Sequence, residues 1–172
     1  MRLEILENAR RKLNFLNDQV LELKVCLPRT FTEYEQNRER QLAIERLCQL
    51  SVESAHDTCE VLIKGLGKTA PTNMWDTLRK AHAEGMLDSV VLQRFAVSFL
   101  GFRNILVHAY EKIENREVFN TAKTMLRHLP NFVAQVRAFI DAQNQPGAAQ
   151  LGARTKSENR NPTPKTGTRK LR

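Results

Sequence analysis

Apolar residues recur at alternating spacings of three and four along most of this chain, and no other feature constrains its fold as strongly. The first run consists of Leu6, Ala9, Leu13, Leu16, Val20, Leu23 and Leu27. Because an α-helix has 3.6 residues per turn, this spacing places all seven side chains on one face, which must be buried. Pro28 follows at once and cannot continue a helix. The run therefore predicts a first long amphipathic helix that ends before Pro28.

A second long helix is predicted from Thr30 to the glycines at 65 and 67. Thr30 and Glu33 have the spacing of a capping box, in which each side chain bonds the other residue's backbone N–H. The apolar positions that follow repeat at helical spacing and form a face that is wide enough to contact more than one neighbouring helix. They are Leu47, Cys48, Leu50, Val52, Ala55, Cys59, Val61, Leu62 and Leu66. We expect this helix to be the central one.

Three further helices are expected in the second half of the chain. A short one begins at Pro71 and Thr72 and is closed by Gly85, and Asp88 is a suitable N-cap for the next. That fourth helix carries the apolar stripe Leu92, Phe95, Phe99, Phe102 and Leu106. The fifth carries Val118, Ala122, Met125, Leu129, Phe132, Val136 and Phe139, with a kink expected at Pro130.

The whole pattern predicts an all-α protein. Sustained alternation of period two and hairpin dipeptides such as Asn-Gly are absent from the sequence, so we expect negligible sheet. An antiparallel bundle of about five helices is the architecture that buries these faces. We find no apolar run that approaches the ~18 residues of a membrane span, and we expect a soluble, cytoplasmic chain without membrane contact.

The positive charge of this chain lies mostly at its C-terminal end. The net charge is +8, and the residues from Gln145 onward carry +6 of it. Those residues are rich in Pro, Gly, Ser, Thr and Asn and have almost no apolar side chains, so burial cannot repay the entropy of ordering them. We predict a helical domain at 1–145 and a disordered basic tail at 146–172. The tail alone could bind nucleic acid nonspecifically, and we expect it to be dispensable for catalysis.

The segment 103–110, read as RNILVHAY, contains the candidate chemistry. Arg103, Asn104, His108 and Tyr110 stand among Ile, Leu, Val and Ala. On an ideal helix Arg103 and Tyr110 lie about 20° apart and Asn104 and His108 about 40° apart, whereas Arg103 and His108 diverge by about 140°. Bringing Arg103 and His108 together requires a distorted turn, a long reach by the arginine, or two chains. A symmetric dimer meets this requirement simply.

Each of these residue types also has an ordinary structural role. A histidine near a helix end can bond the last carbonyls, and the polar residues can serve as a solvated face. Cys26, Cys48 and Cys59 lack CxxC spacing and are expected to be buried thiols. The other histidines lack the spacing of metal ligands, so we predict no metal site and no cofactor. Trp75 is expected in the core rather than as a base-stacking surface.

The order Arg, polar residue, three apolar residues, His, any residue, Tyr resembles the motif of HepT-type HEPN ribonuclease toxins. The similarity extends over residues 1–143 and includes RLCQLSVESAHDTCEVLI, PTNMWDTLRKAHAEGML and GFRNILVHAY. The resemblance implies a HEPN-type five-helix fold and a homodimer whose shared cleft holds both motifs. It also implies metal-independent RNA cleavage in a type VII-like toxin–antitoxin system, with a MntA-type minimal nucleotidyltransferase as the antitoxin.

This resemblance gives each motif residue an expected role. His108 would be the general acid and base, since an imidazole exchanges protons near neutral pH. Arg103 would clamp the phosphate with paired donors, so lysine should replace it poorly. Asn104 would orient the substrate or His108. Tyr110 would line the cleft or accept nucleotides from the antitoxin, and the added charge would repel RNA.

Two acidic residues on the second helix are further candidates. Glu53 and Asp57 lie with Arg46 and Gln49 within about 80° on the polar face of that helix. This face can be simply solvated, or its carboxylates can hold Arg103 and face the cleft. The alternative for the whole protein is a non-catalytic HEPN module that binds nucleotide or a nucleotidyltransferase.

Overall fold

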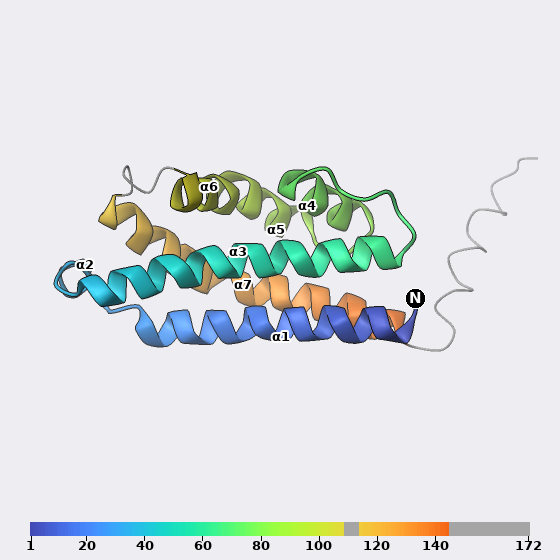
Figure 1. Cartoon of the computed structure of the whole chain (residues 1–172), viewed down its shortest axis with the longest axis horizontal. Helices are drawn as coiled ribbons and strands as arrows, with labels where there is room; N and C mark the ends of the chain where they lie inside the picture. Colours follow the sequence, from blue (N-terminus) through green and yellow to red (C-terminus); the bar gives the residue numbers. More distant parts are fainter. Residues whose placement is uncertain (109–113, 145–172) are drawn as a thin grey trace, which may run out of the picture.

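A computed structural model describes residues 1–108 and 114–144, with His108 described in its backbone only, and every regular element in this part of the chain is a helix (Figure 1). The elements are α1 (Leu3–Cys26), α2 (Phe31–Glu35), α3 (Arg38–Gly65), α4 (Met74–Ala83), α5 (Ser89–Arg94), the π-helix η1 (Phe95–Phe99), α6 (Leu100–His108) and α7 (Asn115–Gln143). The all-α prediction is confirmed. The predicted tail 146–172 lies outside the described residues.

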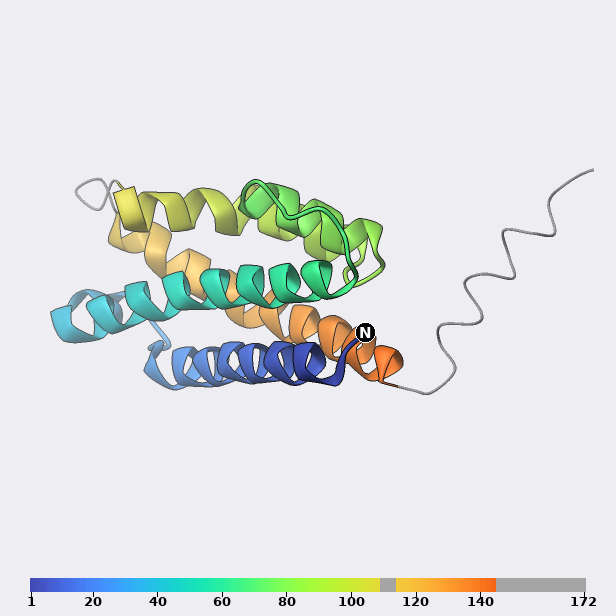
Figure 2. The same cartoon turned by 45° about the vertical axis from the view of Figure 1, so that its right-hand side comes forward.

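The central position of α3 is clear in two views of the molecule. It runs between α1 on one side and the α4–α6 layer on the other, with α7 packed behind it (Figures 1 and 2). Helices α1 and α7 are antiparallel, because Arg10 of α1 bonds Asp141 of α7 at 2.8 Å and Arg137 bonds Asn14 at 3.2 Å. Helix α3 therefore has neighbours on several sides, as its wide apolar seam requires.

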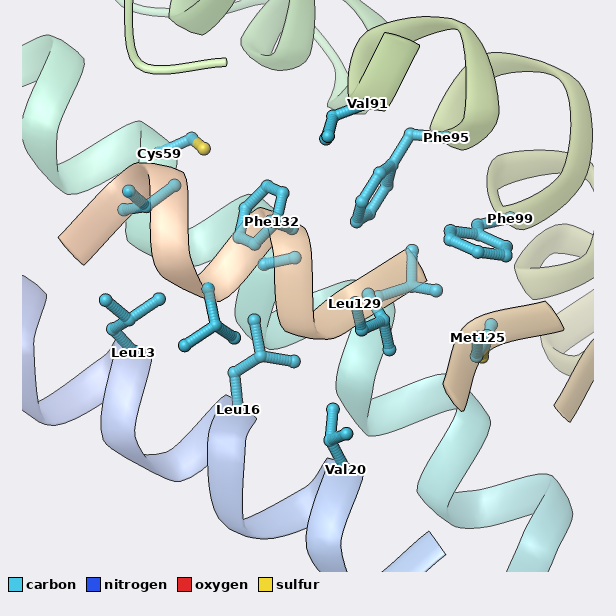
Figure 3. Packing of buried hydrophobic residues seen from close by; sticks show 14 of the residues in the cluster. Leu13, Leu16, Val20, Cys59, Val91, Phe95, Phe99, Met125, Leu129 and Phe132 are labelled. Carbon is cyan, nitrogen blue, oxygen red and sulfur yellow. The ribbon is translucent and has the colours of Figure 1, made fainter. Parts of the chain in front are cut away.

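The core is filled by the apolar stripes that the sequence defines. Leu13, Leu16 and Val20 of α1 point toward α7, and Met125, Leu129 and Phe132 of α7 belong to the same core (Figure 3). Phe95 packs against Phe132 with ring centroids 5.0 Å apart and against Phe99 at the same distance. Burial of a large apolar side chain stabilises a fold by roughly 1.5–3 kcal/mol, so these contacts fix the α5–η1–α6 helix against α7.

The second predicted helix is divided in the structure. The capping box of Thr30 and Glu33 is present, but α2 ends at Glu35 and α3 begins at Arg38. Asn37 has extended backbone angles and accepts a hydrogen bond from the Arg40 N–H, so it caps a new helix. Its preference for capping outweighs continuation of the helix. The expectation of one helix from Thr30 was wrong at this point.

One helical stretch differs from the expectation that no apolar run is long enough to span a membrane. The continuous stretch Ser89–Val107 is 19 residues long and, by length and composition alone, apolar enough to cross a bilayer. The expectation that no apolar run approaches this length was therefore wrong. In the structure, Phe95, Phe99 and Phe102 of this stretch are buried in the core. Much of its other side faces outward, with Val90 63% and Val97 74% exposed.

Candidate functional site

Arg103 is placed by the helix that begins directly after the π-helix. The three phenylalanines of η1 and α6 hold this helix on the core, and the wider π turn lies before Arg103 rather than between Arg103 and His108. From Leu100 to His108 the chain is regular α-helix. The directions of residues 103 and 108 therefore still diverge by about 140° within one chain. The distorted turn considered from the sequence is absent from α6.

The Arg103 side chain reaches across to α3 and bonds Glu53. Its Nη2 donates to Glu53 Oε1 at 2.9 Å, and the two side chains are 22% and 31% exposed. Gln49 Nε2 donates to the same oxygen at 3.0 Å, and Arg46 Nη1 bonds Gln49 Oε1 at 3.0 Å. Arg103 Nε is buried without a hydrogen-bond partner among the described residues. A row of polar contacts along α3 thus ends on the guanidinium of the motif.

Arg103 and Asn104 line a pocket between the start of α4 and α6. Its volume is about 380 Å³, and its walls are Asn73, Met74, Trp75, Leu100, Arg103 and Asn104. Asn104 is exposed, and Trp75 is 44% exposed. The expectation that Trp75 belongs to the core was wrong, because it faces solvent beside the N-cap of α4 while Leu78 on the same helix is buried.

The other two motif residues are only partly described. His108 is the last residue of α6, and its side chain lies outside the described residues. Tyr110 lies outside them altogether. The structure therefore brings together Arg103, Asn104 and Glu53, and gives for His108 the backbone position about 1.4 turns beyond Arg103.

Asp57 is engaged with α1 rather than with Arg103. Its carboxylate accepts a bond from Lys12 Nζ at 2.8 Å and lies 3.4 Å from His56 Nδ1. Burial acts to raise the pKa of Asp57, but the hydrogen bonds and charges of Lys12 and His56 outweigh it and hold the pKa below its ordinary value. Asp57 is therefore ionised at neutral pH. Of the two acidic candidates, only Glu53 contacts Arg103.

Asp57 and two neighbouring side chains have the spacing of a possible metal site. Potential ligand atoms of His56, Asp57 and Glu60 lie within 4.8 Å of one another. Lys12 bonds Asp57, and Lys64 bonds Glu60 at 2.9 Å. These ammonium groups already neutralise the two carboxylates, which weakens the case for a cation there. The cysteines offer no ligands to this cluster, and burial raises the pKa of Cys48 and of Cys59 to about 12.

A second pocket lies between α1 and α3 and was missed by the sequence argument. Its volume is about 340 Å³, and it is lined by Arg11, Lys12, Phe15, Leu50, Glu53, Ser54 and Asp57. Phe15 is 48% exposed at this pocket. Lys12 and Phe15 do not disturb the apolar spacing of α1, so nothing in the local sequence marks them. Which residues of α1 lie beside Glu53 depends on the register of α1 on α3, and this register is a tertiary feature. The sequence therefore contained no signal that would have joined them to Glu53.

Comparison with known proteins agrees with this fold. The family model described as "Ribonuclease HepT-like" matches residues 16–136. A protein named "tRNA nuclease HepT" from Aphanizomenon flos-aquae (strain 2012/KM1/D3) is 27% identical over 108 residues, covering 63% of this chain and 73% of that protein. The structure of the cytosolic protein YutE from Bacillus subtilis matches with a TM-score of 0.70 at 18% identity, covering 81% of this chain and 93% of YutE.

These findings have different weight. The similarity to YutE shows the fold alone, because its sequence identity is low. The family match extends over most of the helical domain and includes Arg103, Asn104, His108 and Tyr110. Together with the named nuclease relative, it supports a toxin-type ribonuclease. The chain belongs to the ribonuclease HepT-like family.

Proposed function

We propose that this protein is a metal-independent endoribonuclease, the toxin of a type VII-like toxin–antitoxin pair. In the proposed reaction the 2′-oxygen of RNA bonds to the adjacent phosphorus and the bond to the 5′-oxygen breaks. His108 accepts the 2′-hydroxyl proton as general base and, as general acid, donates this proton to the leaving 5′-oxygen. Arg103 neutralises the charge on the phosphorane. The products are a 2′,3′-cyclic phosphate and a 5′-hydroxyl.

The observation that carries this proposal is the setting of Arg103. Arg103 and the exposed Asn104 line the same pocket, and Arg103 Nη2 donates a hydrogen bond to Glu53. Within the described residues no hydrogen bond is found at Nη1, so donors remain for a phosphate. Glu53 fixes the direction of the guanidinium, which is how a supporting carboxylate pre-organises a charged group. Asn104 is then placed to contact the same ligand.

A homodimer would bring the second half of the site to Arg103. Exposed residues on the α5–η1–α6 helix follow one stripe at helical spacing, namely Val90, Gln93, Val97, Gly101 and Asn104. His108 is the next position of this stripe, four residues after Asn104. A Cβ added at Gly101 would meet nothing within 4 Å, so a second helix can approach closely there. We propose that two copies pair along this stripe and share one RNA cleft.

Family membership supports a proposal for the remaining partners. We propose that a MntA-type nucleotidyltransferase acts as the antitoxin and modifies Tyr110, which would set negative charge in the RNA cleft. Because one relative is named as a tRNA nuclease, transfer RNA is the first substrate to test. We propose a cytoplasmic location, where this substrate is found.

The direct test is cleavage of transfer RNA in excess EDTA. We expect cleavage by the wild type and none by His108→Ala, with helicity and dimerisation retained. His128→Ala is the matched control, because His128 lies on α7 and is not part of the motif. The ends of the products should carry cyclic phosphate and 5′-hydroxyl groups. Undiminished cleavage by His108→Ala would exclude the proposed mechanism.

The alternative function is a non-catalytic HEPN module that binds nucleotide or the nucleotidyltransferase. The exposed pocket beside Trp75 and Asn104 is the observation that favours it, since an aromatic ring and an amide can hold a base. Expression of the chain without its partner distinguishes the two functions. Growth arrest that depends on His108 supports the ribonuclease, and normal growth supports the module.

A further inference from the structure

The α1–α3 pocket adjoins the candidate site through one shared side chain. Glu53 lines this pocket and also accepts the bond from Arg103 Nη2. A ligand in the pocket would therefore lie one side chain away from the phosphate that Arg103 is proposed to hold. The inference below rests on the proposed ribonuclease function and extends it to residues of α1.

The charged side chains around this pocket differ in whether they are already paired with an opposite charge. Lys12 is neutralised by Asp57 at 2.8 Å, and Glu53 is bonded to Arg103 and Gln49. Arg11 is exposed, and the structure of residues 1–108 and 114–144 gives it no ion pair. Arg11 is thus the cation of the pocket that remains for an anionic ligand.

The pocket also combines an aromatic surface with acceptor oxygens. Phe15 is 48% exposed, and Leu50 adds apolar surface to the lining of the pocket. Both bonds to Glu53 end on Oε1, and no donor to its Oε2 is found within the described residues. Carboxylates repel phosphate but accept hydrogen bonds from the amino groups of bases. The interior of the pocket therefore suits a base, and the Arg11 side suits a phosphate.

We propose that this pocket binds one nucleotide of single-stranded RNA next to the phosphate held at Arg103. The base stacks on Phe15, as bases do on exposed aromatic rings in other single-strand binders. Its amino group donates to Glu53, and Arg11 bonds the flanking phosphate. The pocket volume of about 340 Å³ is within the range of small-ligand pockets. Adenine, cytosine and guanine carry such an amino group, whereas uracil does not.

The test is binding of short 2′-O-methyl oligoribonucleotides, which have no free 2′-hydroxyl to attack, to the full chain by fluorescence anisotropy. Phe15→Ala is compared with Leu21→Ala, because both residues are on α1 and are 48% and 54% exposed. We expect Phe15→Ala to weaken binding roughly five- to 100-fold, and Leu21→Ala to change it by less than about threefold. Arg11→Ala should lower both the affinity and its salt dependence, whereas exposed Arg40→Ala should not.

Base preference gives a second measurement. A cytosine oligomer should bind more tightly than a uracil oligomer of equal length, because the two bases differ in the amino group that Glu53 would accept. Glu53→Gln should reduce this preference, since an amide nitrogen offers no acceptor. Equal binding of the two oligomers by the wild type would overturn the role given to Glu53.

The two proposals fail in different ways. If the wild type cleaves RNA but Phe15→Ala and Leu21→Ala bind and cleave alike, the nucleotide pocket is refuted and the ribonuclease stands. If oligomer binding depends on Phe15 but no RNA is cleaved, the pocket stands and the proposed mechanism is refuted. Absence of both binding and cleavage refutes both.

Discussion

Replacing Glu53 with Gln tests whether Arg103 is held in place by charge. The substitution keeps the size of the side chain and an acceptor oxygen, but removes the charge that faces Arg103 Nη2 at 2.9 Å. Hydrogen bonds to charged groups contribute about 1.5–3 kcal/mol and neutral ones about 0.5–1.5 kcal/mol. Because the two side chains are 22% and 31% exposed, solvent screens part of this difference. We expect a loss of about 1 kcal/mol of unfolding free energy.

Asp141→Asn is the matched control for this measurement. The Arg10–Asp141 pair has nearly the same length, 2.8 Å, but its side chains are 37% and 57% exposed. An exposed pair contributes little, so we expect a loss below about 0.5 kcal/mol. Equilibrium unfolding in urea gives both values, provided the slope against denaturant stays the same. Double-mutant cycles with Arg103→Met and Arg10→Met then isolate each pair.

The effect on catalysis separates a positioning role from a structural one. If Glu53 orients Arg103, Glu53→Gln should lower kcat about tenfold on RNA with uracil at the α1–α3 pocket, a base that makes no bond to Glu53. KM for this substrate should stay level or fall, because one negative charge is removed. The pH optimum should not move, since His108 is unchanged. An equal loss of stability in Glu53→Gln and Asp141→Asn, together with an unchanged kcat, would refute the reasoning.

Three further predictions follow from the same contacts. Arg103→Lys keeps the charge but loses the paired donors, so kcat for RNA cleavage should fall roughly 100-fold while the fold, measured by circular dichroism, is retained. Gly101→Leu should abolish the dimer in analytical ultracentrifugation while the monomer remains folded, because Gly101 is exposed and a Cβ added there meets no atom within 4 Å; a stable Gly101→Leu dimer would exclude pairing along this stripe. Asp57 has a folded-state pKa below its ordinary value of 3.8, so its stabilising contribution is present above that pH and is lost as the pH falls through the folded pKa. Asp57→Asn should therefore make unfolding less dependent on pH below about 4, and an unchanged pH profile would contradict this assignment.

Much of the helical content could be predicted from the sequence because burial and local capping determine it. The apolar spacing of α1 and α7, the capping box at Thr30 and the N-cap at Asp88 are properties of short segments. The break before Asn37 was missed because an asparagine can either cap a new helix or lie within a continuous one, and packing decides between the two. The π turn at Phe95–Phe99 was missed because its phenylalanines have ordinary helical spacing.

The sequence by itself determined which residue types stand at the candidate site and that residues 103 and 108 diverge on a helix, because both follow from local order and helix geometry. Only the tertiary structure decided that Glu53 rather than Asp57 bonds Arg103, and that Lys12 and Phe15 of α1 lie beside Glu53. The two hydrogen bonds join residues that are 45 and 50 positions apart in the sequence and lie on different helices. Their register depends on how whole apolar faces pack together, which no short segment specifies.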